Sequence, residues 1–83
     1  MMAVHLGQRF LLRGSLPQMV MSYAVSEPGE WTAREIAEDI EVTIYVVSET
    51  LRSLRRRGMV LIDGKNVYPT ESGKQVLFRS LAR

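Results

Sequence analysis

The chain has 83 residues, no cysteine and one histidine, His5, and its formal net charge is +2. A domain of this size buries only about 60 % of the surface that its unfolded chain exposes, so we expect a single domain with a modest core. The missing cysteines exclude disulfides and thiolate metal sites, and one histidine cannot form a metal cluster by itself. Arg9 and Arg13 interrupt the N-terminal apolar stretch before it reaches signal-peptide or membrane-span length, and we therefore expect a cytoplasmic protein.

Charge is distributed unevenly along the sequence. Residues 1–50 carry three arginines against seven carboxylates, a balance of −4, whereas residues 51–83 carry eight cations against two carboxylates, a balance of +6. Such an asymmetry is an argument about partners rather than about fold. The second half is where a polyanion would bind.

The first predicted helix spans residues 16–26. Ser15 and Gln18 form a capping-box pattern, Pro17 suits the first turn, and the Glu27-Pro28-Gly29 sequence ends the helix. The apolar positions recur with helical spacing and predict one buried stripe, made of Leu16, Met19, Val20, Tyr23 and Ala24.

Two further helices follow after short breaks. Thr32 and Glu35 form a second capping box, with Trp31 and Ile36 placed for a hydrophobic staple, and predict a helix over about 33–40. Its core side would be Ala33, Ile36, Ala37 and Ile40. Thr43 can cap the next helix, which ends in three arginines before Gly58. Its expected core stripe is Val47, Thr50, Leu51 and Leu54, and its opposite face carries Tyr45, Ser48, Glu49, Arg52 and Arg56.

The rest of the chain predicts a hairpin and a last helix. Residues 59–63 are typical of a strand, residues 63–66 of a tight turn, and residues 67–69 of the returning strand. A last helix is expected from Thr70, and the residues on its core side would be Val76, Leu77, Phe78 and Leu81. The stretch before Ser15 has no clear period, and both an arm and a short dimerisation helix are open there.

This order of elements is that of a winged helix-turn-helix domain, mainly α with a small β-hairpin. Residues 32–60, from the Thr32 capping box to Gly58-Met59-Val60, resemble winged-helix bacterial transcriptional regulators, with spacing closest to the PapI/FaeA-like fimbrial-operon regulators. The run from Val67 to Gly73 is similar instead to the wing-to-helix junction of the MarR and PadR regulators. We expect an N-terminal arm over 1–14 and the winged helix-turn-helix domain over 15–83.

The resemblance implies sequence-specific binding of double-stranded DNA, with the recognition helix, about 43–57, in the major groove and the hairpin, about 59–69, as the wing. Candidate base contacts are Tyr45, Ser48, Glu49 and Arg52. Arg56 is a candidate phosphate contact, and Lys65 at the hairpin tip is placed to reach a phosphate or the minor groove. Thr32 and Thr43 act as caps first, at helix N-termini that can also bind phosphate. The same residues also fit a solvated helix face with a Glu49–Arg52 ion pair, and a polar hairpin tip.

No Ser-His-Asp set, paired carboxylates or glycine-rich phosphate loop is present, so we expect neither an enzyme nor a cofactor, metal or small-molecule ligand. We expect a homodimer, because one small module contacts only a few base pairs. The alternative is a winged-helix protein-interaction module in a replication, segregation or polymerase-associated complex. Its contact surface would then include the acidic first half of the chain and the apolar residues Phe10, Leu11 and Leu12.

Overall fold

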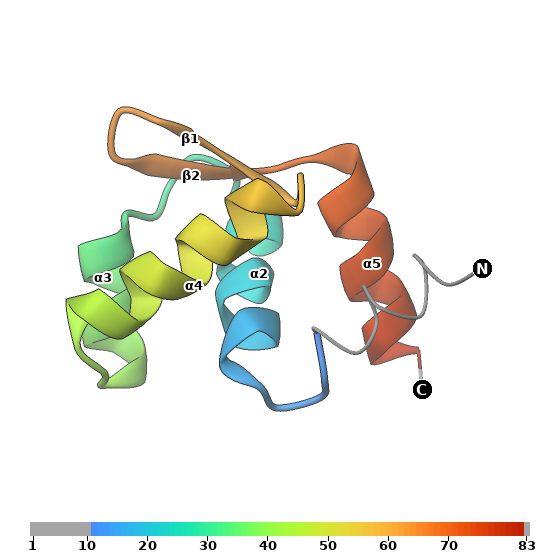
Figure 1. Ribbon diagram of the computed structural model, residues 1–83, viewed down its shortest axis with the longest axis horizontal. Coiled ribbons are helices and arrows are strands. Elements are labelled where there is room, and N and C mark those ends of the chain that lie inside the picture. Colours follow the sequence, from blue (N-terminus) through green and yellow to red (C-terminus); the bar gives the residue numbers. More distant parts are fainter. Residues whose placement is uncertain (1–10, 83) are drawn as a thin grey trace.

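The computed structural model describes residues 11–82, and over that range it is mostly helical with one two-stranded hairpin. The helices α2 (Leu16–Ser26), α3 (Ala33–Ile40) and α4 (Ile44–Arg56) come first. Strands β1 (Val60–Asp63) and β2 (Asn66–Pro69) follow, and α5 (Glu71–Leu81) comes last. The hairpin lies across one end of the helices, and α5 lies beside α2 at the side opposite α3 (Figure 1). The predicted mainly α fold with a small hairpin is confirmed.

Helix α2 begins where the sequence predicts, but its cap differs from the predicted box. The Ser15 hydroxyl accepts from the Gln18 backbone N–H at 3.3 Å. Gln18 Oε1, however, accepts from the Gly14 N–H at 2.7 Å, while the Ser15 N–H donates to the Leu12 carbonyl at 2.9 Å. The capping-box prediction is therefore right in one of its two hydrogen bonds, because a turn before the helix already satisfies the Ser15 donor.

The buried face of α2 is broader than one stripe. The helix contacts α4, α5 and β2, so it is covered on more than one side. Val20, Met21 and Ala24 are fully buried, whereas Met19, which we predicted in the core, is 37 % exposed. The prediction for Met19 was wrong because the buried side of α2 is centred on Val20, Met21 and Ala24, and at about 100° per residue Met19 lies nearly opposite Met21.

Helices α3 and α4 are defined by the predicted caps. The Thr32 hydroxyl accepts from the Glu35 N–H at 3.2 Å, and Glu35 Oε1 accepts from the Thr32 N–H at 3.0 Å. The Thr43 hydroxyl accepts from the Val46 N–H at 3.4 Å and caps α4. Between the two helices, Glu41 adopts a left-handed conformation with φ of 61°, which ends α3 and turns the chain.

The core of α4 is formed by Val47, Leu51 and Leu54, as predicted. Thr50 is the exception, because it is only half-buried and its hydroxyl donates to the Val46 carbonyl at 2.9 Å. That bond satisfies the hydroxyl within its own helix, so Thr50 needs no partner in the core.

The hairpin closes with a two-residue loop. Asp63 pairs with Asn66, and of the loop residues between them Gly64 has a positive φ, of 65°. An L residue rarely adopts that conformation, which is why glycine suits the position. The predicted turn is confirmed.

The sequence did not predict a third backbone segment beside the hairpin. The Val67 N–H donates to the Trp31 carbonyl at 3.0 Å, and the Gly29 N–H donates to the Val67 carbonyl at 2.8 Å. Thr32 and Asn66 form an antiparallel bridge. Residues 29–32 therefore lie along β2, and these bonds fix the hairpin relative to the start of α3.

Helix α5 packs through a face that the sequence only partly predicts. Leu77 is buried as expected, but Phe78 is 55 % and Leu81 48 % exposed, so their predicted inward positions were wrong. Gly73 and Ser80 occupy the packed face instead. A Cβ on Gly73 would lie 2.1 Å from the Met59 carbonyl oxygen, so the close approach of α5 to the start of the hairpin decides which side of the helix turns inward.

Leu11 was predicted in the contact surface of a protein-interaction module, and that prediction was wrong, because the core extends before α2 and buries Leu11 fully in the same cluster as Val20 and Leu77. Leu12 next to it is 61 % exposed. The predicted contacts at Phe10, and the rest of the predicted arm up to that residue, lie outside the described residues. Over the described range, the structure has no helix with the length and apolar character needed to span a bilayer.

Candidate nucleic-acid interface

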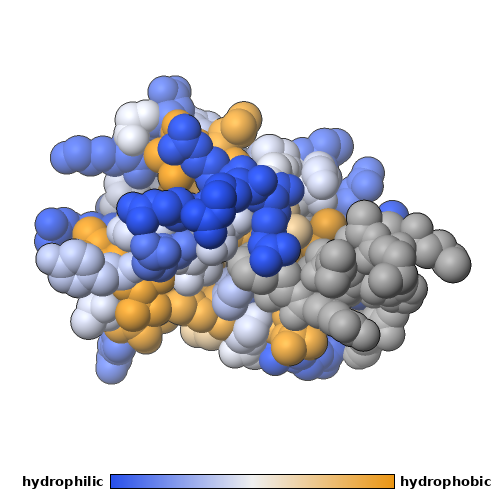
Figure 2. All heavy atoms as spheres, viewed as in Figure 1, coloured by the Kyte–Doolittle hydropathy of each residue, from blue (hydrophilic) through white to orange (hydrophobic). Residues whose placement is uncertain are grey.

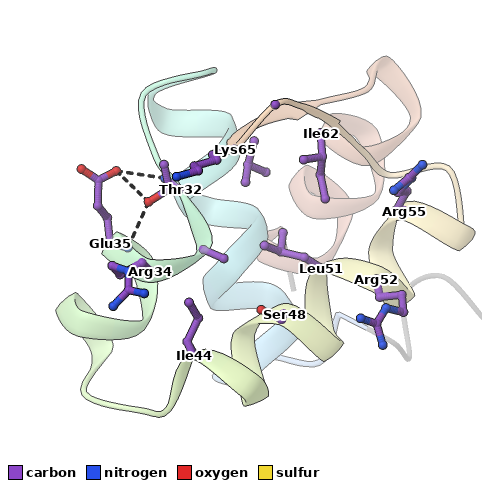
Figure 3. Close-up of a pocket in the computed structure, with 13 residues that line it drawn as sticks. Thr32, Arg34, Glu35, Ile44, Ser48, Leu51, Arg52, Arg55, Ile62 and Lys65 are labelled. Carbon is purple, nitrogen blue, oxygen red and sulfur yellow. Dashed lines mark hydrogen bonds between the residues drawn. The ribbon is translucent and has the colours of Figure 1, made fainter.

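A groove of about 630 Å³ lies between α3, α4 and the hairpin (Figure 3). Its lining includes apolar side chains from three elements, namely Ile44 and Leu51 of α4, Ile62 of β1 and Val67 of β2. Its cations come from α3, α4 and the hairpin loop and are Arg34, Arg52, Arg55 and Lys65. Segments distant in the sequence therefore place positive charge around one apolar groove.

The α4 side of the groove follows from helical spacing. Ser48, Arg52 and Arg55 are separated by four and three residues, which places them on one stripe of the helix. All three line the groove, on the side of α4 next to the buried Val47, Leu51 and Leu54 (Figure 3). The core residues thus fix the rotation of α4 about its axis, and that rotation presents the polar stripe.

The hairpin supplies the opposite side. Lys65 sits in the two-residue loop and extends toward Thr32 at the start of α3 (Figure 3). Backbone hydrogen bonds between residues 29–32 and β2 hold the hairpin beside the N-terminus of α3. The position of Lys65 therefore depends on these bonds as well as on the conformation of its loop.

The charge around the groove is mostly positive. Against the four cations stands one lining carboxylate, Glu35, and its Oε1 accepts from both the backbone N–H and the hydroxyl of Thr32. In the space-filling view, strongly hydrophilic side chains form a band over the face where α4 lies (Figure 2). An anion approaching the groove therefore meets four cations and a single carboxylate, whose Oε1 is already hydrogen-bonded.

The predicted site residues fall into two groups. Those that line the groove are Thr32, Ser48, Arg52 and Lys65. Tyr45, Glu49 and Arg56 lie on the exposed side of α4 beside it, with Tyr45 81 % exposed, and Thr43 caps the same helix. Half of the predicted site residues therefore line the groove, and the other half belong to α4 or to its N-cap.

Two groove arginines were not among the predicted contacts. Arg34 was left out of the candidate contacts, although its place near the start of α3 is the signal that could have identified it. Arg55 was part of the arginine run, in which Arg56 was preferred. The spacing of Arg55 from Ser48 and Arg52 shows that it shares their stripe, whereas Arg56 Nη2 donates to the Ser53 hydroxyl at 3.3 Å.

The predicted ion pair on α4 is present. Arg52 Nη1 and Glu49 Oε2 are 2.6 Å apart, and the two side chains are 62 % and 67 % exposed. A pair this exposed contributes only a few tenths of a kcal/mol to folding, as estimated for neighbouring helix positions. Its geometry therefore matters more for what Arg52 can contact than for stability.

The aromatic pair of Tyr23 and Trp31 lies outside the groove lining. Their ring centroids are 4.7 Å apart at an interplanar angle of 71°, an edge-to-face packing contact. Trp31 Nε1 donates to Glu27 Oε1 at 2.8 Å, and the Tyr23 hydroxyl donates to the Asp39 carboxylate. That hydrogen bond, together with burial and the charge of Asp39, raises the pKa of Tyr23 above its ordinary value of 10.0.

No protein-family model matches the chain, and no curated protein matches it. Two solved structures do. MepR, described as a transcription regulator of the Staphylococcus aureus multidrug efflux pump MepA, superposes with a TM-score of 0.77 at 23 % identity, covering 96 % of this chain and 62 % of MepR. This chain has the winged helix-turn-helix fold.

The second match is the S. aureus MepR–DNA complex, with a TM-score of 0.68 at 24 % identity, covering 89 % of this chain and 65 % of that one. The chain thus spans less than two thirds of the MepR chains. In a winged helix-turn-helix, α3 and α4 form the helix-turn-helix and the β1–β2 hairpin is the wing. The predicted fold is confirmed, and the closer spacing to fimbrial-operon regulators stays a prediction.

Proposed function

We propose that the chain binds double-stranded DNA in a sequence-specific manner and regulates transcription. The observation that carries the proposal is the convergence of Arg34, Arg52, Arg55 and Lys65 from both helices of the helix-turn-helix and from the wing. Phosphate neutralisation by lysine and arginine is the main source of affinity for duplex DNA. The fold shared with MepR, for which a DNA complex exists, supports the same function.

In this proposal α4 enters the major groove, which is about 12 Å wide and admits one helix. Base edges would meet the exposed side chains of α4, namely Tyr45, Ser48, Glu49 and Arg52. The phosphates that flank the DNA major groove would be contacted by Arg34, Arg55, Arg56 and Lys65. Further phosphate contacts would form at the helix N-termini that Thr32 and Thr43 cap. The chain would act in the cytoplasm and without catalysis.

We further propose that the protein acts as a homodimer. Leu12, Phe78 and Leu81 are 61 %, 55 % and 48 % exposed, and a hydrogen bond of 3.1 Å from Arg13 Nη2 to the Leu81 carbonyl places Leu12 near the end of α5. A second copy packed on these apolar side chains would pair two α4 helices and double the contact with DNA. Sedimentation of the protein with and without Phe78→Ser tests this association.

The DNA-binding proposal is tested by fluorescence anisotropy with a short duplex of random sequence, titrated at about 50 mM and about 200 mM salt. We expect binding at the lower concentration and a steep loss at the higher one. Arg52→Ala and Arg55→Ala should each weaken binding. Each should also lower, by about one, the slope of the logarithm of the binding constant against the logarithm of the salt concentration. Arg79→Ala on the exposed side of α5 removes the same charge outside the groove and serves as the matched control.

The second candidate function is a protein-interaction module, and the exposed apolar side chains of Leu12, Phe78 and Leu81 favour it. Absence of duplex binding at low salt would exclude the DNA proposal and leave this one. Phe78→Ser would then abolish function in the cell, whereas Arg52→Ala would not.

A further inference from the structure

Glu49 stands out because it is the one acidic residue within α4, a helix whose exposed side otherwise carries Arg52, Arg55 and Arg56. A carboxylate in the middle of a surface that approaches phosphates weakens binding to every duplex by repulsion. The fold gives no reason for it, since Glu49 is 67 % exposed and its ion pair with Arg52 contributes little to stability. Glu35, the carboxylate in the groove, differs because it completes the Thr32 capping box.

The contact between the two side chains leaves most of the guanidinium free. Glu49 Oε2 accepts from Arg52 Nη1 at 2.6 Å, which uses one of the five N–H groups of arginine. The remaining donors still include an edge with two parallel N–H groups, the arrangement that pairs with O6 and N7 of guanine. Arg52 can therefore contact guanine while Glu49 holds it, and the pair limits its movement toward a phosphate.

The carboxylate also retains acceptor capacity, because Oε1 and one lone pair of Oε2 remain available. In the major groove, cytosine N4 and adenine N6 are amine donors, whereas guanine O6 and N7, adenine N7 and thymine O4 are acceptors that repel a carboxylate. An A·T pair places its amine between adenine N7 and thymine O4, so only a C·G pair presents an amine beside two neighbouring acceptors. A fixed carboxylate beside a fixed guanidinium thus matches an amine next to the two guanine acceptors. One C·G pair, or two adjacent ones, presents that arrangement.

We propose that Glu49 and Arg52 act as one unit that selects a C·G pair, with Glu49 as the specificity-determining residue. Glu49 lowers affinity for all duplexes, and the loss is recovered only where a cytosine amine faces it. This inference rests on the proposed DNA binding and adds which base pair α4 selects.

The test compares the wild type with Glu49→Gln and with Glu71→Gln. Glu71 is the matched control, since it pairs with Lys74 at the same i, i+3 spacing on α5, at 3.8 Å, and lies outside the groove lining. Both substitutions raise the net charge by one. Selection from a random duplex library gives the preferred site, and anisotropy on that site and on its single-base variants gives the discrimination at each position.

We expect the wild type to select at least one C·G pair and to lose about tenfold in affinity when that pair is replaced. Glu49→Gln should bind random duplex about two- to fivefold more tightly and reduce the tenfold discrimination to about twofold or less. Glu71→Gln should retain the wild-type discrimination.

Two results would overturn the inference while leaving DNA binding intact. One is a Glu49→Gln protein that discriminates as the wild type does, which would make the ion pair an ordinary solvated contact. The other is a wild-type site without any required C·G pair. A wild-type protein that binds no duplex at low salt would instead overturn the proposed function itself, and the inference with it.

Discussion

Gln18 and Ser80 are hydrogen-bonded in the core although 62 residues separate them, with Gln18 Nε2 donating to the Ser80 hydroxyl at 3.2 Å. Both residues are buried, at 6 % and 7 % exposure, and the pair joins the first turn of α2 to the last turn of α5. Ser80 in turn donates to the Leu77 carbonyl at 2.7 Å, and Gln18 Oε1 accepts from Gly14. The polar atoms of the pair are therefore satisfied, which is the condition under which polar groups are tolerated in a core.

Ser80→Ala tests the value of this pair. The substitution leaves the Gln18 amide buried without its acceptor, and we expect the free energy of unfolding to fall by about 1 to 3 kcal/mol. Urea denaturation followed by circular dichroism measures the change. Ser72→Ala, at an exposed position of the same helix, is the control and should stay within about 0.5 kcal/mol of the wild type. Equal stability of the two variants would show that water replaces the lost contact.

Gly73 is a second position where α5 depends on close packing. Since an added Cβ would lie 2.1 Å from the Met59 carbonyl oxygen, Gly73→Ala must displace either α5 or the start of the hairpin. We expect a loss of about 3 kcal/mol or more, comparable to severe overpacking of a core. Gln75→Ala, at an exposed position two residues later, should change stability little. A Gly73→Ala protein as stable as the wild type would mean that α5 can shift without cost.

These two positions show why the face of α5 was mispredicted. Its sequence offers Phe78 and Leu81 as apolar candidates, yet glycine and serine take the buried places, because only their small size and hydrogen bond suit the neighbouring backbone and Gln18. The bounds of α3 and α4, in contrast, depend on threonine caps that act within three residues. Helix caps, which depend on residues three positions apart, were predictable from the sequence, whereas packing contacts between distant segments were not.

The same distinction applies to the candidate interface. Ser48 and Arg52 were found from the helical spacing within α4, which is a local property. Lys65 faces them because residues 29–32 pair with β2 and bring the hairpin loop toward the start of α3. No local pattern predicts that pairing, so the groove could not be predicted as a unit.

Tyr23 should make folding stability depend on pH at the alkaline end. Its pKa is raised in the folded protein by the hydrogen bond to Asp39, by burial and by the Asp39 charge, so the folded state retains the proton above pH 10.0, where the unfolded chain loses it. The contribution is thus complete below the unfolded pKa and is lost as pH rises through the folded one. Urea midpoints measured across this range should fall more steeply for the wild type than for Tyr23→Phe.

Asp39→Ala provides the complementary measurement. Removing the acceptor and its charge takes away the first and third causes of the shift, so the pKa of Tyr23 should move back toward 10.0. Ultraviolet absorbance titration of tyrosine ionisation detects the movement. A titration curve identical to that of the wild type would show that burial alone raises the pKa.

Arg52→Lys separates charge from geometry at the proposed interface. Lysine keeps the positive charge but lacks the planar fork that pairs with guanine O6 and N7, and it cannot form the same contact with Glu49 while presenting two parallel donors. We expect affinity for random duplex to change by less than about twofold, because that affinity depends on charge, while affinity for the preferred site falls about tenfold. Anisotropy on both duplexes at one salt concentration gives the two numbers. Arg55→Lys is the control, since a residue that contacts only phosphate should tolerate lysine on both duplexes. If both variants kept the wild-type affinity for both duplexes, Arg52 would be a phosphate contact, and base selection by α4 would have to come from Tyr45, Ser48 or Glu49.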